Sequence, residues 1–89
     1  MAEVNFLVKK GLTVPKGSAS TPAVIFDASD PNTGLYSPGA NHLAVATNGV
    51  GRLFVDASGN VGVGTSSPGS LLEISSSSTP QFFISNTSN

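Results

Sequence analysis

The stretch that decides the fold is Asp56-Ala57-Ser58-Gly59-Asn60-Val61-Gly62-Val63-Gly64-Thr65-Ser66-Ser67-Pro68. A turn sequence at 58–60 runs directly into a segment in which every second residue is glycine. In an extended chain alternate residues face opposite sides, so Val61 and Val63 share one face while Gly62 and Gly64 share the other. Glycine inside a strand weakens it unless another backbone comes very close. The pattern therefore predicts a strand that packs against another chain, with residues 61–64 at the contact.

Short segments with strand character recur along the rest of the chain, separated by turn residues. Between two of them lies Asn48-Gly49, the strongest two-residue hairpin signal. Ser70 and Glu73 have the spacing of a capping box, which predicts a single helical turn there. Apolar residues at helical spacing are otherwise missing, so the fold class is all-β with short strands and tight turns. The predicted strands are 4–8, 23–26, 43–47, 50–55, 61–64 and 81–85.

The composition favours a small protein that associates. The chain has 89 residues, no cysteine, and 10% charged residues, against roughly 25% in ordinary soluble domains. A chain of this size without disulfides or thiolate metal sites buries a modest core, and oligomerisation is a common remedy. We expect residues 1–22 to form an N-terminal attachment segment and linker, and residues 23–74 a β-rich module. Residues 75–89 read as a serine-rich linker and the start of a further strand module.

The charge pattern and the hydropathy pattern exclude several function classes. The net charge is −1, so an electrostatic nucleic-acid binder is not expected. No segment approaches the ~18 apolar residues of a membrane span, and the first residues lack the pattern of a secretory signal. Three of the four cations, Lys9, Lys10 and Lys16, lie near the N-terminus. They form either a solvated edge or a docking patch for an acidic partner.

The candidate catalytic and metal-binding residues are more typical of turns than of an active site or a metal site. His42 is the single histidine, and no nucleophile elbow G-x-S-x-G accompanies it, so we expect no enzyme. Two polar clusters could offer oxygen ligands to a cation, but neither has the EF-hand spacing, and turns demand the same residue types. We therefore expect no metal and no cofactor. The clusters are Asp27, Asp30 and Asn32, and Asp56, Ser58 and Asn60.

Aromatic residues leave an alternative function open. Tyr36, Phe54, Phe82 and Phe83 could form a surface on which sugars stack, although such residues more often belong to a core or an interface. A carbohydrate-binding module that recognises host surface glycans is therefore the second hypothesis.

Three sequence motifs carry a resemblance to a known family. Asp30-Pro31-Asn32-Thr33-Gly34-Leu35-Tyr36-Ser37-Pro38-Gly39-Ala40-Asn41, with the segments 43–49 and 52–56 that follow it, is the first of them. The run from Gly59 to Pro68 is similar to a recurring G-x-V-G-I-G-T-x-x-P module, and residues 5–14 are similar to the start of the same proteins. Over roughly residues 5–74 the chain resembles tail-fibre and related virion proteins of tailed bacteriophages, notably those of marine and cyanobacterial phages.

That resemblance implies a homotrimeric, intertwined β-rich fibre in the phage tail, assembled in the host cytoplasm. Its N-terminal part would dock on a tail adaptor or nozzle protein, and a distal region outside this chain would contact the host receptor. We expect tail attachment through Val4, Phe6, Val8, Lys9 and Lys10.

The subunit interface of such a trimer is expected to include Leu53 and Val55 together with Val61, Gly62, Val63 and Gly64. Valine in place of either glycine should then impair assembly more than the single chain. Which face of the strands points to the trimer axis is left open by the sequence.

Overall fold

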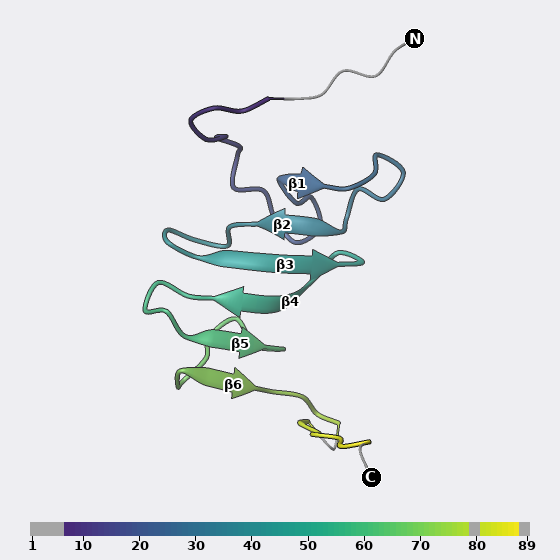
Figure 1. Ribbon diagram of the computed structural model, residues 1–89, viewed down its shortest axis with the longest axis vertical. Coiled ribbons are helices and arrows are strands. Elements are labelled where there is room, and N and C mark those ends of the chain that lie inside the picture. The colour runs from purple at the N-terminus through teal and green to yellow at the C-terminus, as the bar shows by residue number, and fades with distance from the viewer. Residues whose placement is uncertain (1–6, 79–80, 88–89) are drawn as a thin grey trace.

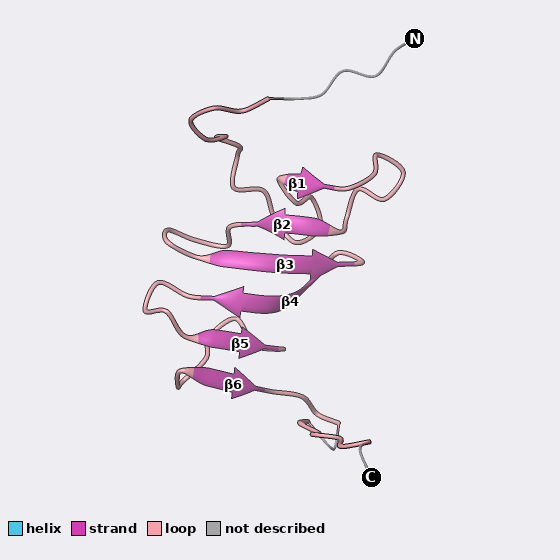
Figure 2. Cartoon of the chain, in the orientation of Figure 1, coloured by secondary structure: helices cyan, strands magenta, loops and turns pink. Residues whose placement is uncertain are grey.

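A computed structural model of the chain describes residues 7–78 and 81–87, which form an all-β structure. Six strands build one sheet in the order of the chain (Figure 1). Every neighbouring pair is antiparallel except β5 and β6, which run parallel. No helix occurs in the described ranges (Figure 2). The strands are β1 (Val24–Ile25), β2 (Gly34–Tyr36), β3 (Leu43–Thr47), β4 (Val50–Val55), β5 (Val61–Val63) and β6 (Leu72–Ile74).

The hairpin between β3 and β4 is confirmed. Asn48 and Gly49 both have positive φ, 55° and 75°, which is the signature of a type I′ turn. The loop that precedes β2 supports this turn, because the Gly49 N–H donates to the Asn32 carbonyl at 2.8 Å. The Asn48 N–H donates to the Thr33 hydroxyl at 3.2 Å. The turn is therefore held both by its own geometry and by a neighbouring loop.

Three sequence predictions are corrected by the structure. Residues 70–73 form no helical turn, because β6 begins at Leu72 and pairs with β5. The Glu73 carboxylate accepts from the Gly69 N–H at 2.7 Å instead of capping a helix. Residues 81–85 form no strand. Part of the predicted strand 4–8 lies outside the described residues, and residues 7–8 are not in a strand.

One face of the sheet carries a thin core, and we call it the covered face. Its buried hydrophobic residues are two aromatic and two small side chains, and Ala19 packs against them. The rings lie over backbone: a Cβ atom at Gly51 would be 2.5 Å from both the Tyr36 hydroxyl and the Phe54 ring. The aromatic rings of this face cover the alanine side chains and the glycine backbone beside them, so few side chains are needed to bury it. The four are Tyr36, Ala44, Ala46 and Phe54.

Residues 15–22, which belong to the expected N-terminal attachment segment and linker, join the sheet. The Ser37 N–H donates to the Lys16 carbonyl at 2.8 Å, and the Ala23 N–H donates to the Leu35 carbonyl at 2.9 Å. Pro22 is buried. In the described residues the six strands form one sheet, with no second layer of strands or helices against it (Figure 1).

Candidate subunit interface

The second face of the sheet, which we call the open face, is aliphatic from β1 to β6. Because directly paired residues point to the same side of a sheet, the strand register defines rows of side chains across it. One row crosses all six strands and a shorter one runs from β3 to β6. The rows are Val24, Leu35, Val45, Leu53, Val63 and Ile74, and Leu43, Val55, Val61 and Leu72.

A β-bulge adds Val50 to the open face. Val45 pairs with Leu53, but Ala46 pairs with Gly51, so Arg52 has no partner residue across the ladder. One extra residue reverses the alternation of the residues before it. Val50, which pairs with Thr47, therefore lies on the open face instead of the covered one.

The open face is accessible to solvent. Its most exposed strand residues retain between 39% and 56% of their surface: Leu43, Val50, Leu53, Val63 and Leu72. A contiguous exposed apolar patch of more than a few hundred Å² marks an interaction surface in soluble proteins. The residues expected at a subunit interface, Leu53, Val55, Val61 and Val63, are brought together on this face by the register.

Among the strand residues, Arg52 is the charged one whose side chain lies beside this apolar surface. Its Nε donates to the Thr47 hydroxyl at 2.8 Å, and its Nη2 donates to the Thr47 carbonyl at 3.3 Å. Arg52, Val50, Val63 and Ile74 line a shallow depression of about 440 Å³ together with polar residues that follow β6. The guanidinium is thus held at the margin of the aliphatic rows by the end of β3.

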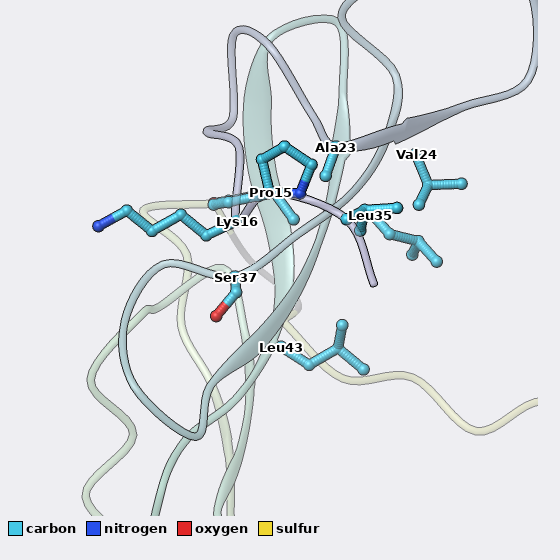
Figure 3. Close-up of a pocket in the computed structure, with 9 residues that line it drawn as sticks. Pro15, Lys16, Ala23, Val24, Leu35, Ser37 and Leu43 are labelled. Carbon is cyan, nitrogen blue, oxygen red and sulfur yellow. The ribbon is translucent and has the colours of Figure 1, made fainter. Parts of the chain in front are cut away.

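A hollow of about 320 Å³ lies at the β1–β2 end of the open face (Figure 3). Three residues of the open face contribute to it: Val24, Leu35 and Leu43. In Figure 3 their aliphatic ends extend to the same side, and the Lys16 ammonium points to the opposite side. The remaining lining residues are Val14, Pro15, Lys16, Ala23, Tyr36 and Ser37.

The glycines of β5 approach a segment of their own chain. Gly62 is buried on the covered face, and a Cβ atom there would lie 3.1 Å from Thr65 Cγ2 and would run into the Thr65 carbonyl. Gly64 follows the strand with φ +82°, and its Cβ would run into the Ser75 carbonyl. The close approach expected at these positions is present, but the same chain supplies it, through the connection to β6 at Gly62 and through the residue after β6 at Gly64. Val61 and Val63 lie on the other side, on the open face.

The remaining polar candidates take part in turns. The Asp56 carboxylate accepts from the N–H groups of Ser58 and Asn60 at 3.0 and 2.9 Å. The Asp27 carboxylate accepts from the Ser29 N–H at 3.1 Å. Among the described residues no group of three or more histidine or acidic residues is placed to hold a metal ion.

His42 also serves a turn. Its N–H donates to the Gly39 carbonyl at 3.1 Å, and its carbonyl accepts from the Ser37 hydroxyl at 2.8 Å. His42, Asp56 and Ser66 line one depression of about 230 Å³. Asp56 Oδ1 is engaged by the turn at 58–60, and within the part of the chain that the structure describes no hydrogen bond links these three side chains.

The aromatic and N-terminal candidates are dispersed. Tyr36 and Phe54 are buried on the covered face, whereas Phe82 and Phe83 are exposed. Of the residues expected to attach the chain to a tail, Val4 and Phe6 lie outside the described residues, and Val8, Lys9 and Lys10 are exposed.

Comparison of the chain with protein-family models, with curated proteins and with solved structures gave no match. In residues 7–78 and 81–87 there is no helix of the length and hydropathy needed to cross a bilayer. The open face is thus the candidate site to which the geometry of the described residues points.

Proposed function

We propose that the chain is a structural, non-enzymatic protein that works as a homotrimer, in which the open faces of three copies pack together around a common axis. The observation that carries this proposal is the continuous aliphatic surface of the open face. Its rows run through paired residues on all six strands and contain no polar side chain.

The energetics favour association through this face. Full burial of one aliphatic side chain stabilises by about 1.5–3 kcal/mol, and the rows offer many partly exposed ones at once. Sheets that pack face to face lie about 10 Å apart, so side chains of facing rows can interdigitate. The thin core of the covered face gives a single chain little other apolar burial.

The biological setting is proposed from the resemblance to phage fibre proteins. The trimer would form part of a tail-fibre shaft in the virion. The exposed segment with Val8, Lys9 and Lys10 would dock on an acidic surface of a tail protein, and a distal region outside this chain would contact the host receptor.

Sedimentation equilibrium tests the oligomeric part of this proposal. The wild-type chain should have three times the mass of a single chain, and Leu53→Lys should have the mass of a monomer, because the substitution places a charge in the middle of the long row. Ala57→Lys, in the exposed turn before β5, is the matched control and should remain trimeric. A wild-type mass equal to one chain at high concentration would refute the proposal.

Electron cryomicroscopy of the virion that encodes this chain tests the setting. Density for three copies between the tail and the receptor-binding tip is the expected result, and particles that lack the chain would contradict it. The alternative, a carbohydrate-binding module, gains no support from the placement of the aromatic residues, since Tyr36 and Phe54 are buried. Binding of the chain alone to a glycan array would make it the better hypothesis.

A further inference from the structure

The two ends of the open face differ in shape. At the β1–β2 end lies the hollow of about 320 Å³, walled by Val24, Leu35 and Leu43. That volume corresponds to about ten water molecules. Most residues that line it are apolar, Tyr36 and Ser37 also contribute to its wall, and the ammonium of Lys16 points away from the three aliphatic side chains (Figure 3). The hollow therefore suits an apolar side chain better than water.

At the other end of the same face, Leu72 projects from β6. It keeps 56% of its surface, the largest exposed fraction among the aliphatic residues of the two rows. Leu72 and Leu43 belong to one row, through the pairs Leu43–Val55, Val55–Val61 and Val61–Leu72. Three strand spacings of about 4.8 Å separate them, roughly 14 Å in total, so Leu72 cannot reach the hollow of its own chain.

We infer that Leu72 of one copy enters the hollow of a second copy of this chain. This inference rests on the proposed function, because it takes the open face to be a subunit interface, and it adds the register of that interface. The hollow opens on the same face, so it is continuous with the proposed contact. In a cyclic trimer each contact joins two different patches, and the hollow and Leu72 form such a complementary pair.

The hollow end could instead meet a second hollow end. Such an isologous contact would leave two apolar hollows unfilled and Leu72 exposed, and voids in an interface forfeit dispersion contacts. Packing of Leu72 into the hollow removes both defects at once. No charged group has to be desolvated there, because the Lys16 ammonium lies outside the hollow.

Disulfide cross-linking tests this contact directly, because the chain contains no cysteine. Full-length Leu43→Cys and Leu72→Cys chains are mixed, allowed to exchange subunits and oxidised. A covalent dimer that contains one Leu43→Cys chain and one Leu72→Cys chain is the expected result. Each chain carries a single cysteine, so any disulfide joins two chains, and it forms only where their Cα atoms come within about 4.4–6.8 Å. A mixture of Leu43→Cys with Ala57→Cys is the matched control and should stay uncross-linked.

Three outcomes would overturn the inference. A homodimer of Leu43→Cys alone would show that hollow meets hollow. An oligomer that persists without a cross-link between positions 43 and 72 would exclude this register and leave the proposed function standing. A wild-type chain that is monomeric would contradict both the inferred contact and the proposed homotrimer.

A second variant covers the case in which the cysteines disturb folding. Leu72→Ala should raise the dissociation constant by about tenfold or more, since it removes one buried side chain from each contact. Leu72→Met, of similar volume, should keep the dissociation constant within about tenfold of the wild type. Equal affinity of Leu72→Ala and the wild type would overturn the inference.

Discussion

Gly62 lies directly under Pro68: a Cβ atom added to Gly62 would be 3.4 Å from Cδ of Pro68. The reason lies in the topology. β5 and β6 run parallel, so the connection between them has to pass over one face of the sheet. It passes over the covered face at Gly62 and leaves the open face free. The glycine is thus required by the crossover of its own chain.

Replacement of Gly62 should destabilise the single chain. A Cβ atom there would run into the Thr65 carbonyl, which belongs to the backbone and cannot swing away. We expect Gly62→Ala to lower the free energy of unfolding by about 1–3 kcal/mol, measured by urea denaturation. Gly69→Ala is the matched control, because its Cβ would make only an ordinary contact of 3.8 Å with the Glu73 carboxylate. Equal stability of the two variants would contradict the close approach.

Gly49 should be required for its backbone conformation. Its φ of +75° costs a residue with a Cβ about 1–2 kcal/mol. Gly49→Ala is therefore expected to lower the melting temperature. Gly49→Asn should lower it less, because asparagine tolerates the left-handed region. The space around Gly49 does not decide the outcome, since its nearest neighbour would be the Asn32 side chain at 3.7 Å. Thermal melts that rank asparagine below alanine would refute this explanation.

Deletion of Arg52 should be tolerated. Arg52 is the unpaired residue of the bulge, so its removal restores regular alternation and keeps Val50 and Leu53 on the open face. We expect a loss of about 1 kcal/mol, from the Thr47 hydrogen bonds and from the bond that the Gly64 N–H donates to the Arg52 carbonyl at 2.9 Å. Deletion of Val45 from β3 is the matched control. It should unfold the chain, because it moves Leu43 and Ala44 to the wrong faces. Circular dichroism and thermal unfolding of both variants measure the difference.

Assembly through the open face should be insensitive to salt. The rows contain no charged side chain, so salt has no attraction between charges to screen at this interface. We expect the same oligomeric mass from about 0.05 to about 1 M sodium chloride. The association should weaken on cooling, as hydrophobic contacts do. Dissociation at high salt in sedimentation velocity experiments would instead indicate an interface held by charge, for example through Lys9 and Lys10.

Much of the local structure could be predicted from the sequence. The alternation of β5, the Asn48-Gly49 hairpin and the two strands that it joins each follow from preferences that act within a few residues. The prediction of a helical turn at 70–73 was wrong. The capping-box spacing competes there with the alternating pattern of a strand, which at three residues, Leu72 to Ile74, is too short to recognise alone. Pairing with β5, whose partner residues lie eleven positions earlier in the chain, decided between the two patterns.

The sequence by itself determined that this protein is all-β, that it has tight turns of defined type, and that Val61 and Val63 face away from Gly62. These properties depend on backbone sterics and on side-chain alternation, both of which are local. The tertiary structure alone decided that the crossover covers Gly62, that Arg52 forms a bulge, and that the aliphatic residues of six strands align on one open face. These properties depend on register between distant segments, which is set by hydrogen bonds and packing across the sheet and not by any one strand.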